Sequence, residues 1–442
     1  FGMNKTIEKI VSLCKRRGFI FQSSDIYGGF AAVYDYGPLG IELKNSISQL
    51  WWKEMTQAHE NIVGLDSGIL MHPRIWEASG HVGAFHDPLV DCRQCKARYR
   101  ADELTETLEE VNWQEFKCPK CGTTGNLTDP RQFNLMFKTH AGPVEESGAE
   151  AYLRPETAQG IYVNYQLVQG AMRLKVPFGI AQVGKAFRNE IVARNFIFRT
   201  REFEQMEMQY FVKPGTDDEL LKEWKEKRFR FYPDMLGLDE EKIRYHQHGE
   251  NELAHYAKEA WDIEYEFPFG WSEIEGIHNR TDFDLYRHQE FSGKNLAYFD
   301  QPNNERFLPY IIETSAGLNR MLLAVLADAY WEDEKNDQVV MRFHPRLAPV
   351  KAVICPLVKK DGLPEKAREI VDILKPQFKV LYDQQGSIGK RYYRQDEAGT
   401  PFGITVDHQT TEDNTVTLRH RDTQQQDRLS IDQLLPAIQN KM

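Results

Sequence analysis

The 442-residue sequence lacks a continuous apolar run of about 18 residues, the length that a membrane-spanning helix needs. It also lacks the long apolar segment of a secretory signal after Met3, and it shows no internal repeat or low-complexity tract. We therefore expect a cytoplasmic protein with no membrane segment. With 41% hydrophobic and 12% aromatic residues the chain can build cores, and its length predicts two or three domains.

The sequence has no excess of positive charge. Its 55 Lys and Arg residues against 66 Asp and Glu residues give a net charge of −11, which argues against a protein coated by nucleic acid. From Pro345 onward the chain is close to neutral, so the excess negative charge lies before that point. A near-neutral tail permits local contact with RNA, but ordinary variation in surface charge explains it too, and charge alone favours the second explanation.

Cysteine is scarce. Of six cysteines, Cys14 and Cys355 lie in apolar surroundings that are typical of a core. The other four form two Cys-x-x-Cys pairs separated by residues 96–117. Four thiolates suit a closed, tetrahedral, structural Zn²⁺ site, whereas the alternative of disulfides has no secretory context to support it. The predicted zinc ligands are Cys92, Cys95, Cys118 and Cys121.

Residues 178–190 and 201–212 both have strand composition, which predicts a hairpin. Because strand residues alternate between two faces, the second strand divides into an apolar set and a mixed set. The apolar set, expected in the core, is Met206, Met208 and Tyr210. The mixed set is Phe203, Gln205 and Glu207. An aromatic ring, an amide and a carboxylate in a row suit a ligand, although a solvated sheet face is the alternative.

Two arginines stand at positions where strand or helix geometry can aim them into one pocket. Arg188 lies at the end of the first strand, and Arg320 lies in the first turn of an apolar helix that follows Gly317. A cation at the positive end of a helix is explained if an anion lies opposite it. Arginine forks suit phosphate, and the neighbouring carboxylates suit an ammonium group or a metal. The combination predicts a nucleoside triphosphate and an amino compound as ligands.

The organisation of the chain follows from its changes in composition. We expect helices at 6–17 and 41–59, a charged helical insertion at about 213–261 and a polar loop at 284–304. Alternating strands and helices after a linker at 347–349 predict a separate α/β domain. The expected divisions are 3–90, a Cys₄ insertion at 91–129, a second core part at 130–344 and the last domain at 345–442.

The hairpin and the arginine-bearing helix resemble motifs 2 and 3 of the class II aminoacyl-tRNA synthetases. The turn and helix at 36–59 are similar to motif 1, the dimer element, although an ordinary core helix fits its periodicity equally well. Longer segments resemble the homodimeric glycyl-tRNA synthetases over nearly the whole chain. These segments are 25–29, 34–40, 76–81, 153–160, 195–207, 280–285 and 388–392. The chain departs from the family at Thr314, where proline is usual, and in the Cys₄ insertion, which is not universal.

The resemblance implies an α+β fold, in which helices flank an antiparallel sheet that carries a zinc-ribbon-like insertion and a C-terminal α/β anticodon-binding domain. It implies a glycine–tRNA ligase. Glycine's carboxylate attacks the α-phosphate of ATP, pyrophosphate leaves, and the glycyl group passes to the terminal ribose of tRNA(Gly). Positioning and charge stabilisation suffice, without a nucleophilic side chain. Mg²⁺ and a second copy of the chain are further implied partners.

Two alternatives from other classes are weaker. A catalytically inactive, nucleic-acid-binding accessory subunit would keep the scaffold but lose the phosphate-binding arginines, and both Arg188 and Arg320 are present. A zinc-ribbon nucleic-acid adaptor would not need the hairpin.

The resemblance also implies roles for individual residues. Arg188 holds the α-phosphate and Arg320 the γ-phosphate, while Phe203 stacks on adenine and Glu190 meets its amino group. Further ATP contacts are expected from Asn189, Phe198, Arg199, Thr200, Arg201, Glu273, Ile274 and Gly317. Glycine is expected to contact Arg100, Glu156, Phe203, Gln205, Glu207, Glu313, Ser315 and Gly317, which exclude larger amino acids by crowding. Glu273 and Glu313 are the candidates for Mg²⁺.

Overall fold

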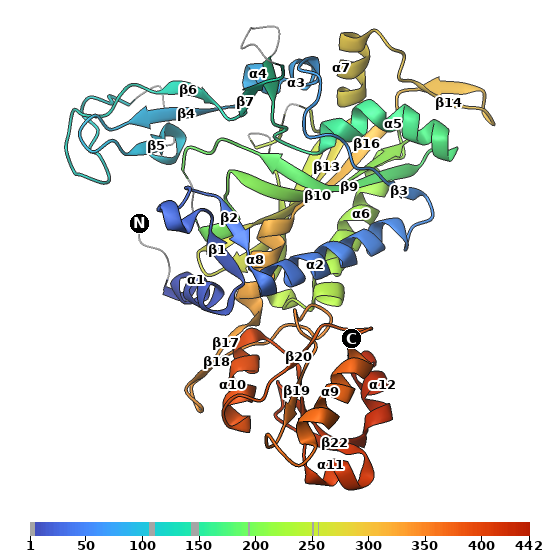
Figure 1. The fold of residues 1–442 in the computed structure, drawn as a ribbon. Coiled ribbons are helices and arrows are strands. Elements are labelled where there is room, and N and C mark those ends of the chain that lie inside the picture. The colour runs from blue at the N-terminus through green and yellow to red at the C-terminus, as the bar shows by residue number, and fades with distance from the viewer. Residues whose placement is uncertain (1–4, 106–110, 143–149, 193–194, 250–251, 255) are drawn as a thin grey trace.

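A seven-stranded sheet forms the centre of the computed structural model, which describes residues 5–105, 111–142, 150–192, 195–249, 252–254 and 256–442. Residues 3 and 4 of the expected first domain and 106–110 of the expected insertion lie outside these ranges. The strand order is β11-β12-β13-β16-β10-β9-β3, antiparallel except for the parallel pair β3 and β9 (Figure 1). The strands are β3 (Ile62–Gly64), β9 (Phe178–Phe187), β10 (Glu202–Val212), β11 (Ile243–Gln247), β12 (Glu259–Phe267), β13 (Gly270–Thr281) and β16 (Tyr310–Gly317). The predicted antiparallel sheet is confirmed.

Helices cover both faces of this sheet. On the face toward the C-terminal part lie α1 (Lys5–Arg17), α2 (Pro38–Thr56), α6 (Asp217–Phe231) and α8 (Leu318–Ala329), which share one apolar core with the sheet. On the opposite face lie α3 (Arg74–Ala78), α4 (His81–Ala84), α5 (Ala158–Met172) and α7 (Phe283–Ser292). The predicted helices at 6–17 and 41–59 are confirmed as α1 and α2. The second begins earlier than expected because Pro38 occupies its first position, where the missing N–H of proline costs nothing.

The structure corrects two expectations about insertions. The segment 213–261 is not wholly helical, because only α6 is a long helix and β11 and β12 form the edge of the large sheet. The edge strand β11 buries only Ile243 of its five residues, so it has no continuous apolar face. The expected polar loop at 284–304 contains most of α7 and the strand β14 (Tyr298–Asp300), which pairs with β15 (Glu305–Phe307).

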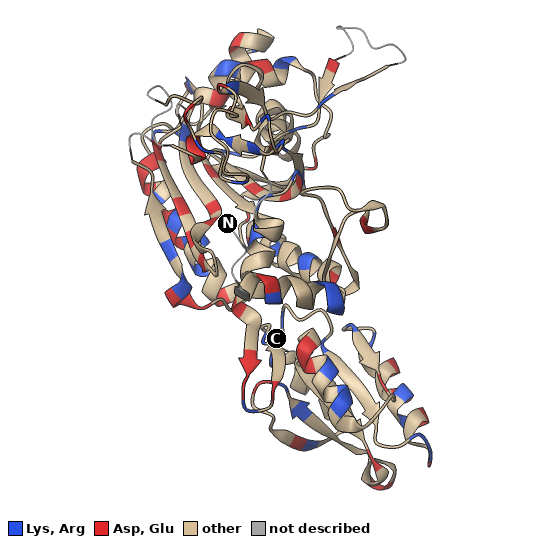
Figure 2. Cartoon of the chain, turned by 90° about the vertical axis from the view of Figure 1, so that its left-hand side faces the viewer, with Lys and Arg blue, Asp and Glu red and all other residues tan. Residues whose placement is uncertain are grey.

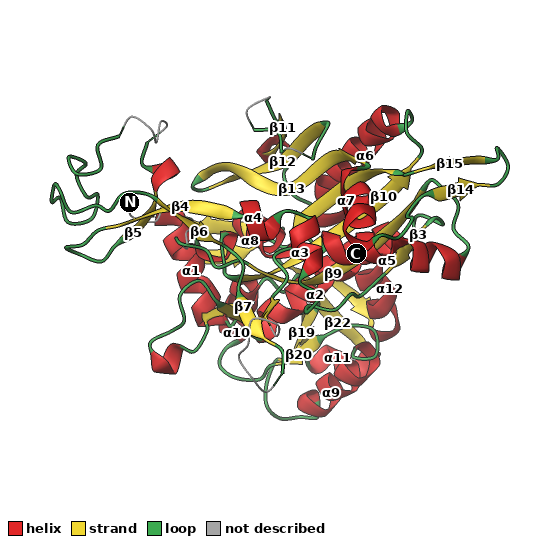
Figure 3. Cartoon of the chain, turned by 90° about the horizontal axis from the view of Figure 1, so that it is seen from above, coloured by secondary structure: helices red, strands yellow, loops and turns green. Residues whose placement is uncertain are grey.

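A three-stranded sheet carries the two Cys-x-x-Cys pairs. Its order is β5-β4-β6, with β4 (His86–Asp91), β5 (Arg98–Arg100) and β6 (Arg131–Asn134). Its small core contains Val90, Trp113 and Leu127 together with Cys92 and Cys118. Seen from above, this sheet projects from one end of the large sheet (Figure 3). The hairpin β7 (Lys138–His140) and β8 (Glu150–Tyr152) follows it in the chain.

The C-terminal part has its own sheet and its own apolar core. The order is β20-β19-β21-β22-β23, parallel among the first three strands and antiparallel among the last three. Its strands are β19 (Ala352–Pro356), β20 (Val380–Tyr382), β21 (Phe402–Val406), β22 (Thr415–His420) and β23 (Gln426–Ser430). Its helices are α9 (Leu363–Leu374), α10 (Ile388–Ala398), α11 (His408–Asp413) and α12 (Leu434–Gln439). The predicted α/β architecture is confirmed.

Two hairpins complete the fold: β1 (Ile20–Gln22) with β2 (Tyr34–Tyr36), and β17 (Tyr330–Asp333) with β18 (Gln338–Met341). Lys and Arg are interspersed with Asp and Glu on the strands of the large sheet and on the C-terminal helices (Figure 2). Among the helices that the structure describes, none combines the length and the apolarity needed to cross a bilayer.

Candidate active site

The register of the central strands gathers polar side chains on one face of the sheet. Gln205, Glu207 and Gln209 of β10 pair with Gly317, Ser315 and Glu313 of β16. Paired residues project to the same face, so the functional groups of both strands meet there. Met206 and Met208 are fully buried in the core beneath the opposite face. The predicted division of this strand into a core face and a polar face is confirmed, and ligand binding by the polar face stays a prediction.

A cleft opens beside this polar face. The predicted residues that line it are Arg188, Glu190, Phe198, Arg199, Thr200, Phe203, Gln205, Glu273, Ser315, Gly317 and Arg320. Sequence reasoning missed three lining residues, Ile197, Glu204 and Asn319. Most of the expected ATP-binding set therefore surrounds one cavity.

Three of the expected ATP contacts do not line the cleft. The side chain of Ile274 is fully buried in the apolar core. Arg201 donates from Nη1 to the carbonyl oxygen of Ala31 at 3.2 Å, and the backbone N–H of Asn189 donates to Leu135. These residues support the walls of the cleft instead of facing into it.

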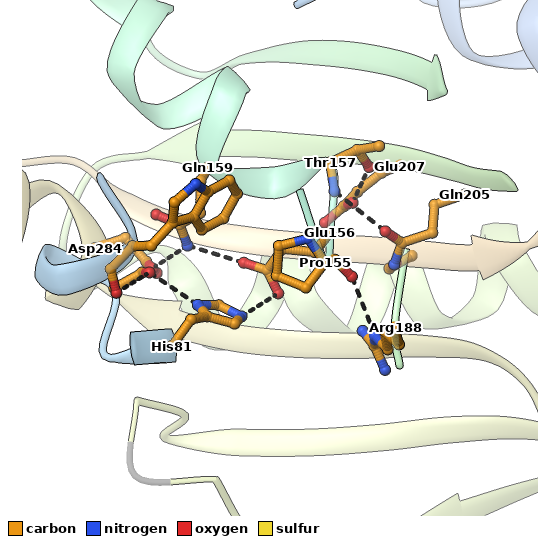
Figure 4. Close-up of polar contacts among 12 residues, drawn as sticks. His81, Pro155, Glu156, Thr157, Gln159, Arg188, Gln205, Glu207 and Asp284 are labelled. Atoms are coloured by element: carbon orange, nitrogen blue, oxygen red, sulfur yellow. Dashed lines mark hydrogen bonds and ion pairs between the residues drawn. The ribbon is translucent and has the colours of Figure 1, made fainter. Parts of the chain in front are cut away.

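The guanidinium group of Arg188 is fixed on three sides. It lies over the rings of Phe85 and Phe203, 5.4 Å and 5.3 Å from their centroids. Its Nε donates to the carbonyl oxygen of Pro155 at 3.0 Å (Figure 4). A planar cation over two aromatic faces is held in one orientation, which suits recognition of a phosphate.

Arg320 lies in the first turn of α8, as predicted. Its Nε donates to the carbonyl oxygen of Phe198 at 3.2 Å, and its Nη1 lies 3.1 Å from Oε2 of Glu273. The guanidinium group also covers the ring of Phe198 at 4.2 Å. The positive end of the helix dipole and this cation face the same cleft, which favours an anionic ligand.

Beyond the cleft, Glu207 and Glu313 form a buried pair bridged by one amide. Nε2 of Gln209 donates to Oε1 of Glu207 and to Oε2 of Glu313, both at 2.8 Å. The hydroxyl group of Thr157 donates to Oε2 of Glu207. Thr157 is the N-cap residue of α5, but its side chain makes no capping hydrogen bond there.

The two carboxyl groups differ in their charged neighbours. Arg280 donates to Glu313 from Nη1 at 3.2 Å, and Nδ1 of His278 lies 3.0 Å from its Oε1. Burial acts to raise the pKa of Glu313, but Arg280 and His278 more than offset this and hold the pKa below its usual range. Burial, reinforced by Glu313 and Glu156, raises the pKa of Glu207 well above its ordinary value. Of the two carboxyl groups, Glu207 is therefore the one that binds a proton more readily.

Glu156 completes the carboxylate group at the turn before α5. Its Oε2 lies 3.3 Å from Nε2 of His81, and its Oε1 accepts from Nε2 of Gln159 at 2.9 Å (Figure 4). Burial would raise the pKa of Glu156, but His81 above all, with Arg280, lowers it to about 2. An ionised carboxylate at this place suits an ammonium group.

Polar contacts connect the cleft to this carboxylate group. Gln205 and Ser315 line the cleft, and Nε2 of Gln205 donates to Oγ of Ser315 at 3.3 Å. The Oε1 atom of Gln205 accepts from the backbone N–H of Thr157 at 3.1 Å, and the hydroxyl group of Thr157 reaches Glu207. A continuous series of polar contacts therefore links the cleft to the carboxylate group.

Arg100 does not join this group, contrary to expectation. Its Nη1 lies 3.0 Å from Oδ2 of Asp87, and its Nη2 lies 2.6 Å from Oδ2 of Asp102. The residue lies in β5 of the small sheet, where these two carboxylates already satisfy its charge.

Sequence reasoning missed several residues of the site. His81 and Arg280 stood inside segments that resemble the family, but no chemical role was assigned to them. Gln209 continues the parity of Gln205 and Glu207, which was a usable signal. No pattern in the sequence pointed to His278.

The four predicted zinc ligands converge. The Sγ atoms of Cys92 and Cys121 are 3.7 Å apart, those of Cys95 and Cys118 are 3.8 Å apart, and all four lie within 4.8 Å of one another. A tetrahedral Zn²⁺ with Zn–S bonds of about 2.3 Å requires sulfur atoms roughly 3.8 Å apart. The residues present therefore fit a structural zinc ion. Within the described ranges, no other His, Cys, Asp and Glu group has such a ligand arrangement.

Comparisons with known proteins agree with this geometry. Residues 137–329 match the family described as tRNA synthetase class II core domain (G, H, P, S and T). Residues 351–441 match the anticodon binding domain. The first match contains most of the residues that line the cleft, and the second covers the C-terminal sheet.

Several curated relatives are similar over nearly their whole length. A glycine–tRNA ligase of Treponema denticola is 61% identical over 99% of this chain and 97% of its own. The enzyme of Borrelia hermsii is 54% identical with the same coverage. That of Chlorobaculum tepidum is 50% identical over 99% of this chain and all of its own. The chain therefore belongs to the glycine–tRNA ligase family of the class II aminoacyl-tRNA synthetases.

Proposed function

We propose that the cleft binds ATP and glycine together and performs the first step of the glycine–tRNA ligase reaction that this family membership assigns to the chain. One observation carries the proposal. Arg188 and Arg320 line the same cleft, which leads through Gln205 and Ser315 to the carboxyl groups. Glu207 and Glu313 are buried there, and Glu156 is partly buried. An inactive accessory subunit would have no use for this arrangement.

On the phosphate side, Arg188 would meet the α-phosphate and Arg320 the γ-phosphate. When the carboxylate of glycine attacks, negative charge grows on the α-phosphate, and a guanidinium group already fixed over two rings stabilises it without rearrangement. Phe203 and Glu190, which line the cleft, would receive adenine.

Mg²⁺ would offset charge on the leaving pyrophosphate, and the geometry separates its two candidate ligands. Glu273 lines the cleft with a side chain that is 46% exposed, so it can reach a metal bound to phosphates. Glu313 is enclosed by Arg280, His278 and Gln209. We therefore assign Glu273 to Mg²⁺ and Glu313 to glycine.

On the amino-acid side, the ammonium group of glycine would lie among Glu156, Glu207 and Glu313. Glu207 must release its proton to pair with the ammonium, because its pKa is raised in the empty pocket. The free protein then binds one proton more than the complex, so affinity for glycine rises with pH until the pH passes that raised pKa. The same crowded groups would exclude a side chain larger than hydrogen.

Replacing Glu207 by alanine tests the amino-acid pocket. The variant opens space for a methyl group but also removes a charge-assisted contact that glycine and alanine both need. We expect the rate of glycine-dependent ATP–pyrophosphate exchange to fall about tenfold or more, while the alanine-to-glycine rate ratio rises.

Glu202→Ala is the matched control, because Glu202 lies on the same strand but pairs with Lys185 in solvent. The control should keep the parental rate and ratio. Full glycine activity with an unchanged ratio in Glu207→Ala would place Glu207 outside the pocket.

We further assign anticodon recognition to residues 345–442, which would read unpaired bases by stacking and edge contacts. The match of residues 351–441 to the anticodon binding domain supports this. We also propose that two copies of the chain associate through the region of α2, as its similarity to motif 1 implies.

The Cys₄ group would hold one structural Zn²⁺ per chain. We expect metal analysis of the purified protein to find close to one zinc atom per chain and Cys92→Ser to lose it, because three thiolates bind the ion much more weakly. Arg93→Ser is the control, since Arg93 lies between Cys92 and Cys95 in the chain, is exposed and supplies no thiolate. Undiminished zinc in Cys92→Ser would contradict the assignment.

A further inference from the structure

One short segment, residues 81–85, contacts both halves of the site. It consists of α4 and Phe85, and it leads directly into β4 of the sheet that carries the cysteines. His81 at its start reaches Glu156, and Phe85 at its end reaches Arg188. Neither residue lines the cleft itself.

We propose that this segment is a positioning element, in which His81 orients Glu156 for the ammonium group of glycine and Phe85 orients Arg188 for the α-phosphate of ATP. The inference rests on the proposed function, because it assumes those two ligands. The proposal adds two positioning residues to the site, His81 and Phe85, neither of which would touch a substrate.

His81 is held so that one ring nitrogen faces the carboxylate. Oγ of Ser79 lies 2.8 Å from Nδ1, and the rings of Trp76 and Phe85 meet the imidazole edge-on at 5.6 Å and 5.2 Å. Nε2 then lies 3.3 Å from Oε2 of Glu156, with the two side chains only 14% and 16% exposed. A nitrogen that faces a carboxylate in this way must carry the hydrogen, so His81 is the donor.

The ring of Phe85 is one of two aromatic rings that the guanidinium group of Arg188 covers. The other is Phe203 of β10, and Nε of Arg188 donates to the carbonyl oxygen of Pro155. Removing one ring leaves the guanidinium group free to rotate away from the position where charge develops. A displacement of this size is costly because the reaction depends on alignment.

Hydrogen bonds hold the segment to the end of β6 and, through Leu135, to the residues just after β9. The backbone N–H of Leu135, just after β6, donates to the carbonyl oxygen of Phe85 at 3.1 Å. Leu135 in turn accepts from the N–H of Asn189 at 2.7 Å. Nδ2 of Asn134 donates to the carbonyl oxygens of His81 and Val82 at 3.3 Å and 3.2 Å. These hydrogen bonds therefore fix the position of the segment relative to Glu156 and Arg188, which would bind glycine and ATP.

The test is a pair of variants with opposite kinetic signatures in ATP–pyrophosphate exchange. His81→Ala should raise KM for glycine about tenfold and leave KM for ATP within about twofold, because it removes a hydrogen bond to a charged group on the amino-acid side only. Phe85→Ala should raise KM for ATP or lower kcat about tenfold and change KM for glycine much less, because Ser79 and Trp76 still hold the imidazole of His81. His81→Gln keeps a donor and Phe85→Tyr keeps an aromatic face, so both should recover most of the loss.

Gly83→Ala is the matched control within the same helix, since Gly83 is exposed and an added methyl group meets no atom within 4 Å. It should behave as the parent. Equal changes of both KM values in each variant, or a folded His81→Ala with the parental KM for glycine, would overturn the inference.

If an alanine variant does not fold, His81→Gln and Phe85→Leu carry the same test. Phe85→Leu keeps bulk but lacks the aromatic face, so it should show the phosphate-side loss. His81→Gln should keep the parental KM for glycine within about threefold, and a larger rise with intact folding would overturn the inference. Absence of glycine-dependent exchange in the parent would instead refute the proposed function, which separates the two failures.

Discussion

Replacing Arg188 by alanine is expected to abolish measurable glycyl-adenylate formation in a protein that still folds. The guanidinium group is held over Phe85 and Phe203 at the cleft, where it would stabilise charge that develops on the α-phosphate. Loss of one preorganised donor costs about 10²–10³-fold in rate, and an arginine that serves phosphoryl chemistry can contribute more. Pyrophosphate exchange and thermal unfolding should be measured on the same preparation.

Two further variants sharpen this prediction. Lys185→Ala removes a cation from β9, which ends just before Arg188, but Lys185 is 49% exposed and pairs with Glu202, so it should keep full activity. Arg188→Lys keeps the charge without the planar fork and should recover only part of the rate. Near-parental exchange in folded Arg188→Ala would remove Arg188 from the site.

Replacing Arg228 by alanine is expected to destabilise the core that supports the site. Arg228 of α6 is 1% exposed and donates from Nε to Oε1 of Glu275 at 2.7 Å, beneath β13. The hydroxyl group of Tyr232 donates to Oε2 of the same carboxylate at 2.7 Å. Removing the cation leaves Glu275 buried and unpaired in charge, which costs about 3–5 kcal/mol of the free energy of unfolding. Denaturant or thermal unfolding measures the loss.

Arg230→Ala provides the comparison on the same helix. Arg230 is 48% exposed and pairs with Asp234 and Glu240 in solvent, so its removal should cost no more than about 1 kcal/mol. Equal stability losses in the two variants would mean that the buried pair does not hold α6 to the sheet.

Elements with a clear apolar pattern could be predicted from the sequence, and elements without one could not. The helix α1 was predicted at 6–17 and is observed at Lys5–Arg17, because its apolar residues recur at helical spacing. The helix α10 was not predicted, because its buried residues are Arg391, Asp396 and Glu397 with only one apolar residue, Ala398. The edge strand β11 was read as helix for a similar reason, since an edge strand needs no continuous apolar face.

The site shows the same limit at the level of single residues. The parity of β10 predicted which side chains share a face, because alternation is a local property of a strand. The contact between His81 and Glu156 joins two segments that are distant in the chain, and no local pattern brings them together. For Arg100 the pairing of β4 with β5 brings Asp87 close, whereas Asp102 is a local neighbour two residues along the chain.

The central claim is that one cleft activates glycine with ATP. The most direct measurement is ATP–pyrophosphate exchange by the purified protein with each of the twenty amino acids in turn. We expect rapid exchange with glycine, exchange with alanine and serine lower by at least about a hundredfold, and none above background with the larger amino acids. Exchange that is absent with glycine, or as fast with alanine as with glycine, would contradict it.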